Sequence, residues 1–219
     1  MRFLPQSEPP GASSRINPSG KDALIVVDMQ RGYLDASLRS SFPNAYSVEL
    51  EMLSNVNALV ECAHNSRIPV YFSVISFSPE QAVDNLWVKH VPQLGLLRAH
   101  SAFVEVDSRI GFKPEQDVLV AKQYPSVFTC PTFVTSLRNH DITRCIFCGI
   151  TMSGCIMASV MDALPRGITP IVVRDAVADR TDSLRDIALG KVQKTYSEVW
   201  LSKNAQLAFS INTRTTIPI

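Results

Sequence analysis

The sequence predicts an α/β fold, a three-layer α/β/α sandwich built on a mostly parallel, doubly wound sheet. Five short apolar runs, rich in β-branched residues and largely without alternation, recur along the chain, which is typical of strands buried on both faces. Helical patterns lie between these runs, and this alternation favours helices packed on both faces of a parallel sheet. The 219 residues, of which 46% are hydrophobic, suit a single domain over residues 21–219.

The strands are predicted at residues 23–28, 69–75, 117–122, 144–149 and 169–175. The clearest helix lies between the first two, where one apolar stripe repeats with a helical period. This stripe contains Val48, Met52, Leu53, Val56, Leu59, Val60 and Ala63. Further helices are predicted from about residue 131, over residues 155–166 with Gly167 as the stop, and over residues 183–196.

Two segments interrupt this rhythm. Residues 1–20 are rich in proline and serine and are predicted to form an irregular N-terminal arm. Residues 76–116 are too long for a simple connection, and we expect this mostly irregular stretch, with residues 77–111 at its centre, to be a lid or an oligomer contact.

Composition excludes several classes of protein. The net charge is +1 and 19% of residues are charged, which indicates no nucleic-acid partner and no anionic membrane surface. No apolar run approaches the roughly 18 residues of a membrane span, and the N-terminal stretch lacks the apolar core of a secretory signal. Five cysteines are too few for a disulfide scaffold, so we expect reduced thiols in a cytoplasmic protein.

Three chemically useful side chains come together when only strand ends are considered. Asp28 ends the first predicted strand, Lys122 ends the third, and Cys155 follows the fourth at the start of a helix. Ligands of parallel sheets bind at the carboxyl ends of the strands. Helix N–H dipoles would favour the thiolate of Cys155, and backbone N–H groups there could hold an oxyanion. The set indicates hydrolysis by acyl transfer, with a carboxylate to move the proton.

Three segments of the sequence are similar to the signatures of the isochorismatase-like cysteine hydrolases, over about residues 21–196. They are Val26-Val27-Asp28-Met29-Gln30, Lys122 followed by Tyr124, Ser126 and Phe128, and Gly149-Ile150-Thr151-Met152-Ser153-Gly154-Cys155. Within that superfamily, residues 151–155, 161–164 and 172–180 most resemble the N-carbamoylsarcosine and maleamate amidohydrolases. Trp87 also fits this branch.

The resemblance implies an amidohydrolase without cofactor or metal, acting on a small amide or ureide. It implies Asp28 as general acid and base, Lys122 as its electrostatic partner and Cys155 as nucleophile. It also implies a cis peptide between Ile150 and Thr151, and an oxyanion hole formed by the N–H groups of Thr151 and Cys155. Members of this superfamily commonly assemble, so a homodimer or homotetramer is expected.

The same resemblance suggests how the substrate is held. In members that act on carboxylate-bearing amides, the position of Arg180 is expected to bind the carboxylate, which a guanidinium can do with two parallel hydrogen bonds. Arg180 could instead pair with Asp175, Asp179 or Asp182. Met152 stands where related amidohydrolases usually have a small polar residue, which predicts a bulkier and less polar pocket. The further substrate-binding candidates are Met152, Trp87 and Phe128.

Other interpretations stay open. Taken singly, Cys155 could be a core thiol, Asp28 a turn cap and Lys122 an edge charge. Isochorismatases proper cleave a vinyl ether and do not need the thiol, which gives an alternative reaction. A catalytically idle binding or scaffold protein is a third possibility.

Metal and redox sites are not predicted. Cys145 and Cys148 have C-x-x-C spacing, but positions three apart on a strand point to opposite faces. Residues 76–81 also lack the Asp-x-His element of metal-dependent nicotinamidases.

Overall fold

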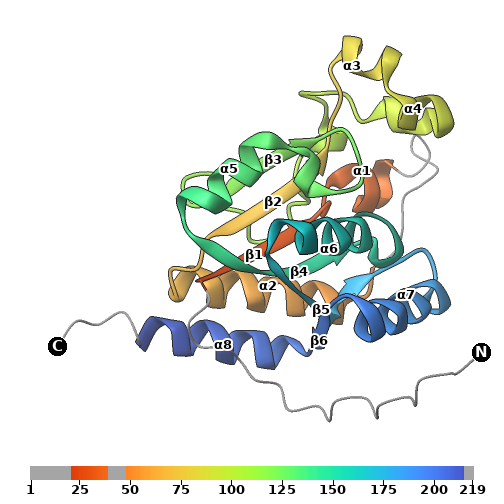
Figure 1. The fold of residues 1–219 in the computed structure, drawn as a ribbon. Coiled ribbons are helices and arrows are strands. Elements are labelled where there is room, and N and C mark those ends of the chain that lie inside the picture. Colours follow the sequence, from red (N-terminus) through yellow and green to blue (C-terminus); the bar gives the residue numbers. More distant parts are fainter. Residues whose placement is uncertain (1–20, 39–47, 215–219) are drawn as a thin grey trace, which may run out of the picture.

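The computed structural model describes residues 21–38 and 48–214 and shows one sheet of six strands with helices on both faces (Figure 1). Every strand pair is parallel, and the order is β3-β2-β1-β4-β5-β6. The predicted fold class is therefore confirmed, while the predicted arm at residues 1–20 lies outside the described residues. The strands are β1 (Lys21–Val27), β2 (Val70–Ile75), β3 (Val118–Lys122), β4 (Ile142–Ile150), β5 (Thr169–Ala178) and β6 (Glu198–Trp200).

The helices form two layers. One face of the sheet is covered by α2 (Leu50–Asn65) and α8 (Ser202–Arg214), which pack on each other, and the other by α5 (Pro131–Asn139), α6 (Met157–Ala163) and α7 (Asp182–Thr195) (Figure 1). Shorter helices are α1 (Arg31–Leu34), α3 (Pro79–Asp84) and α4 (Leu86–His90). Among the described residues, no helix is long and apolar enough to cross a membrane.

Helix α2 forms because its apolar residues repeat on one stripe. The stripe packs against the sheet, and its buried members are Met52, Leu53, Val56, Leu59, Val60 and Ala63.

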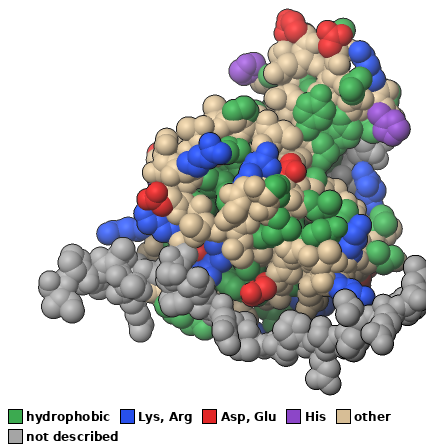
Figure 2. Space-filling model, viewed as in Figure 1, with side chains coloured by type: hydrophobic (Ala, Val, Ile, Leu, Met, Phe, Trp, Pro, Cys, Tyr) green, Lys and Arg blue, Asp and Glu red, His purple; other side chains and the backbone are tan. Residues whose placement is uncertain are grey.

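On the visible face of the molecule, acidic and basic side chains are scattered, with no large field of one sign (Figure 2).

The winding of the sheet reverses between β1 and β4, and this is where a ligand is expected in such a fold. Gly149 of β4 lies opposite Val27 of β1 and has φ +105°. A Cβ at this position would overlap the carbonyl oxygen of Val27, so only glycine lets the two strands approach so closely. The neighbouring carboxyl ends of β1 and β4 are therefore held together at the switch point.

The structure departs from the predicted elements in places. The helix expected over residues 155–166 begins earlier, as a π-helix over Met152–Ile156, and continues through α6 and the 3₁₀ turn Leu164–Arg166 to a left-handed Gly167. Strand β6 and helix α8 were not predicted. Residues 76–116 contain more structure than expected, namely α3, α4 and the 3₁₀ turns Pro92–Leu96 and Ala102–Val104.

Candidate active site

A cavity of about 250 Å³ opens at the carboxyl edge of the sheet. Its walls come from the ends of β1, β2, β4 and β5, from α1, and from the segment that contains α4. The lining residues are Asp28, Tyr33, Ile75, Trp87, Val91, Leu94, Pro125, Ile150, Thr151, Ser153, Gly154, Cys155 and Arg180. Asp28 and Cys155, two of the three side chains selected from strand ends, line this cavity. Lys122, the third, lies next to it in contact with Asp28.

Asp28 and Lys122 form a buried ion pair. Nζ of Lys122 lies 2.8 Å from Oδ2 of Asp28, and the two side chains are 0% and 1% exposed. The other carboxylate oxygen of Asp28 accepts a 2.7 Å hydrogen bond from Oγ of Ser73 on β2. A buried charge pair is tolerated when its remaining hydrogen-bonding capacity is satisfied, and Ser73 meets this need.

The surroundings of Lys122 keep its side chain charged. Burial lowers the pKa of this ammonium, but the interactions with Asp28 and, to a smaller extent, with Cys155 outweigh burial, so that the pKa is raised on balance. The nitrogen also donates to the carbonyl oxygen of Tyr124, at 3.4 Å. Lys122 is thus a permanent positive charge beside the carboxylate.

Cys155 lies in the π-helix and is only 7% exposed. Burial, together with the negative charge of Asp28, raises the pKa of the Cys155 thiol, while Lys122 acts in the opposite direction. Burial thus opposes the helix dipoles, which were expected to favour the thiolate of this residue. A thiol with a raised pKa needs a nearby base before it can act as a nucleophile, and the carboxylate of Asp28 is near enough to interact with it.

The turn before Cys155 has an unusual backbone. The peptide bond between Ile150 and Thr151 is cis. The N–H groups of Gly154 and Ile156 both donate to the carbonyl oxygen of Thr151, at 3.2 and 3.1 Å. Gly154 is needed here, because a Cβ would come within 2.6 Å of Oγ1 of Thr151.

Asp179, at the end of β5, connects this turn with Arg180. Its Oδ2 accepts the N–H of Ser153 at 2.6 Å and its Oδ1 accepts the N–H of Arg180 at 2.8 Å. The residue is 9% exposed. Sequence reasoning missed Asp179 as a site residue and treated it only as a possible partner of Arg180. The one available signal was an acidic residue directly after a buried strand.

Arg180 lines the cavity and is exposed. Within the described part of the chain its guanidinium makes no ion pair, and the three aspartates considered as partners are engaged elsewhere. Asp175 binds Ser202, and Asp182 binds Arg185. The guanidinium is thus available to a ligand.

Two predicted substrate-binding residues do not line the cavity. Met152 is completely buried in the hydrophobic core. Phe128 is 3% exposed, packs edge-on against Phe133 at 5.2 Å and lies under the guanidinium of Arg166. The inference that Met152 makes the pocket bulky and apolar is therefore wrong, because its side chain points into the core. Trp87, the third candidate, does line the cavity.

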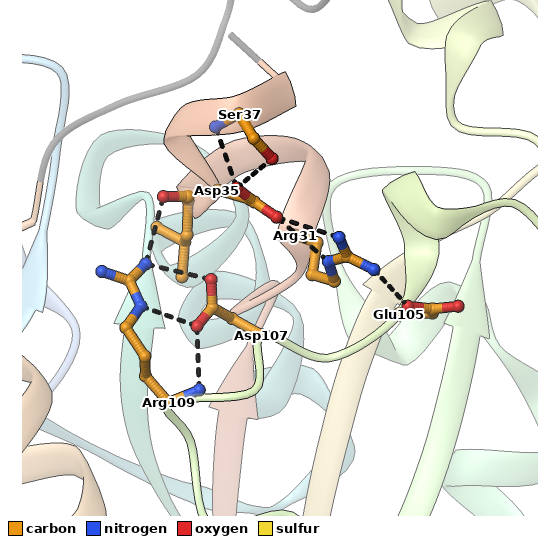
Figure 3. Close-up of polar contacts among 7 residues, drawn as sticks. Arg31, Asp35, Ser37, Glu105, Asp107 and Arg109 are labelled. Atoms are coloured by element: carbon orange, nitrogen blue, oxygen red, sulfur yellow. Dashed lines mark hydrogen bonds and ion pairs between the residues drawn. The ribbon is translucent and has the colours of Figure 1, made fainter.

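Tyr33 enters the cavity from α1, and two arginines fix this short helix to residues 105–109 (Figure 3). Arg31 pairs with Glu105 at 2.7 Å and with Asp35 at 3.0 Å. Arg109 pairs with Asp107 at 2.8 Å and donates to the carbonyl at the end of α1. These contacts hold one wall of the cavity in place.

The described residues contain no group of three His, Cys, Asp or Glu side chains that could hold a metal ion. Cys145 and Cys148 are both free and completely buried. Burial raises the pKa of each thiol, which makes neither a ready metal ligand.

Residues 22–203 match the family model described as "Isochorismatase domain". The chain belongs to the isochorismatase family. Among curated members, maleamate amidohydrolase of Pseudomonas putida is 26% identical over 87% of this chain and 88% of its own length. N-carbamoylsarcosine amidase of an Arthrobacter species is 24% identical over 86% of this chain and 71% of its own.

A solved structure shows the same fold. The crystal structure of a cysteine hydrolase from Pseudomonas syringae pv. phaseolicola 1448A superposes with a TM-score of 0.80 at 20% identity, covering 87% of this chain and 92% of that one. The family and fold resemblance stated from the sequence is thereby confirmed.

Proposed function

We propose that this isochorismatase-family protein is a cysteine-dependent amidohydrolase that cleaves a linear carbon–nitrogen bond in a small amide or ureide. The observation that carries the proposal is the buried Asp28–Lys122 pair, brought from two separate strands to the cavity that also contains Cys155. The two curated relatives, named for maleamate and N-carbamoylsarcosine, support an N-carbamoyl or maleamate-like substrate.

In the first half of the reaction, Asp28 removes the proton of the Cys155 thiol as sulfur attacks the substrate carbonyl. The negative charge that develops on oxygen is held by the N–H groups of Thr151 and Cys155. In support, the N–H groups of Ser153, Gly154 and Ile156 are bound to other oxygens, so they do not compete for this role.

The carbon–nitrogen bond then breaks. Asp28 gives its proton to the departing nitrogen, so ammonia or an amine leaves and a thioester with Cys155 remains. Asp28 next takes a proton from water, which attacks the thioester and releases the acid and the free thiol. Lys122 keeps a positive charge beside the carboxylate throughout.

Residues of the cavity walls bind the substrate. We assign Arg180 to a substrate carboxylate, since its guanidinium lines the cavity and forms no ion pair within the described residues. Trp87 supplies an apolar wall. We also propose that the protein is cytoplasmic, which its five free thiols support. We further propose a homodimer or homotetramer, which sedimentation analysis would test.

The test is a screen for released ammonia and amine across carbamoyl amino acids, maleamate, biuret, ureidoacrylate and nicotinamide. Cys155→Ala, Cys155→Ser and Asp28→Asn should lose turnover while keeping the fold, as circular dichroism would show. Cys62→Ala is the matched control, because this half-buried thiol on α2 lies outside the cavity.

Near-normal amide hydrolysis by Cys155→Ala would overturn the proposal. Pyruvate released from isochorismate by both the parent and Cys155→Ala would favour the vinyl ether reaction instead. Absence of any turnover, together with a Cys155 thiol that resists alkylation at neutral pH, would favour a catalytically idle binding or scaffold protein.

A further inference from the structure

The two ends of the cavity differ in chemistry, and the strand order sets which end is which. Arg180 follows β5 and gives one end a positive charge. The other end lies over the carboxyl ends of β2 and β3, which are on the opposite side of β1 from β4 and β5. That end is apolar, with walls from Ile75, Trp87, Val91, Leu94 and Pro125.

The apolar end is fixed to the strands beneath it. Asn85 caps α4 by accepting the N–H groups of Trp87 and Val88, and its Nδ2 donates to the carbonyl of Gln123 at 3.2 Å. Gln123 in turn donates to the carbonyl of Ser76, at 3.1 Å. These two carbonyls come directly after β3 and β2, so Trp87 is held above the ends of these strands.

The reacting groups lie between the two ends, in a fixed order. Cys155 follows β4, next to β5, while Asp28 follows β1, next to β2. The strand that leads to Asp28 is therefore nearer the apolar end than the strand that leads to Cys155. Because Asp28 must protonate the departing nitrogen, that nitrogen points toward the apolar end and the acyl part points toward Arg180.

We infer that the substrate is a secondary amide, with a carboxylate on its acyl part and a small apolar substituent on its leaving nitrogen. This inference rests on the proposed hydrolase function and specifies its substrate. Sulfur of Cys155 bonds to the carbonyl carbon, the carbon–nitrogen bond breaks, and the amine leaves with the proton that Asp28 took from the thiol. Water then converts the thioester to a second carboxylate and the free thiol, so the products are a diacid and a small alkylamine.

The cavity also sets the size of the substituent. Its volume of about 250 Å³ is below the ~300–1,000 Å³ typical of sites for drug-sized ligands, which leaves room for a few carbon atoms beyond the amide. Each methylene that leaves water for the apolar end should improve kcat/KM about fourfold. A primary amide, which releases ammonia, would leave these walls without contact.

The experiment compares succinamate with N-propylsuccinamate and N-butylsuccinamate, which share one acyl group and one product. Succinate release gives kcat/KM for all three. We expect the N-butyl amide to exceed succinamate at least tenfold. Equal or better hydrolysis of succinamate would overturn the inference.

Two variants locate the effect. Trp87→Ala should bring the ratio of the two kcat/KM values close to one. Trp200→Phe is the matched control, because it changes the chain's other tryptophan, on β6 and outside the cavity, and should keep the parent ratio. An unchanged ratio in Trp87→Ala would contradict an apolar subsite at this wall.

A binding measurement tests the apolar subsite independently of the hydrolase proposal. Calorimetry with Cys155→Ala should show at least tenfold tighter binding of N-butylsuccinamate than of succinamate. That result, together with no turnover by the parent protein, would support the apolar subsite and contradict the hydrolase proposal. Equal binding of the two amides would overturn the inference even if the parent hydrolyses both.

Discussion

Nζ of Lys122 lies 2.8 Å from Oδ2 of Asp28, although the two residues come from strands that are not neighbours. Strand β2 runs between them and contributes Ser73, whose hydroxyl binds the second carboxylate oxygen of Asp28. Three neighbouring strands thus contribute to the surroundings of one buried carboxylate. This arrangement makes the site part of the sheet's own packing, so changes to it should affect both stability and turnover.

Lys122→Met should leave the Asp28 carboxylate buried without a counter-charge. Removing one partner of a buried ion pair costs about 3–5 kcal/mol, so urea unfolding at pH 7 should show a loss of this size. The double variant Asp28→Asn with Lys122→Met has no buried charge and should recover most of the loss. A double variant no more stable than Lys122→Met would show that the pair does not contribute in this way.

The sequence was enough to predict five of the six strands and to select three side chains that the structure brings together, because apolar runs mark parallel strands and the ends of such strands converge. It could not predict Ser73, since this contact depends on register. Ser73 lies opposite Val27, which places its hydroxyl next to Asp28. No periodic pattern in the sequence carries that information.

The same limit explains the errors around the pocket. The resemblance to related amidohydrolases predicts Met152 in the pocket, but the π-helix turns its side chain into the core. Strand β6 is only three residues long, too short for a recognisable pattern. Asp179 acts through two backbone N–H groups, and such contacts leave no mark on side-chain patterns.

Asp179→Asn tests whether this carboxylate positions Cys155, the proposed nucleophile. The N–H groups of Ser153 and Arg180 bind different oxygens of Asp179, and in asparagine one of these oxygens is replaced by an NH2 group, which donates and cannot accept. We expect kcat to fall at least tenfold, with a smaller rise in KM, because the turn that carries Cys155 loses its anchor. Asp182→Asn, on the exposed end of α7, is the control and should match the parent. A parent-like kcat in Asp179→Asn would rule out the positioning role.

Gly149→Ala should destabilise the protein strongly. A left-handed φ alone costs an alanine about 1–2 kcal/mol, and here the new Cβ would also overlap the carbonyl oxygen of Val27. Gly167→Ala is a matched control, because Gly167 also has a positive φ but no atom within 4 Å of the Cβ position. Urea unfolding should therefore show a clearly larger loss for Gly149→Ala. Equal losses would mean that strand β4 moves away from β1 at little cost.

The buried thiols predict how stability changes with alkaline pH. Burial raises the pKa of Cys145, Cys148 and Cys155 in the folded protein, whereas an unfolded cysteine ionises near pH 8.5. Above that pH the unfolded chain loses protons that the folded protein keeps, so the free energy of unfolding falls as pH rises. Each thiol contributes a slope that approaches about 1.4 kcal/mol per pH unit.

Cys148→Ala isolates one of these thiols. The variant should be less stable at every pH, because it leaves a cavity in the core, but its slope between pH 9 and 9.5 should be about one third smaller. Urea unfolding in closely spaced buffers measures this slope directly. The interval lies below the ordinary ionisation range of lysine and tyrosine, so Lys122 and Tyr71, whose pKa values are also raised, contribute little there. A slope equal to that of the parent protein would show that the folded protein ionises Cys148 as readily as the unfolded chain does.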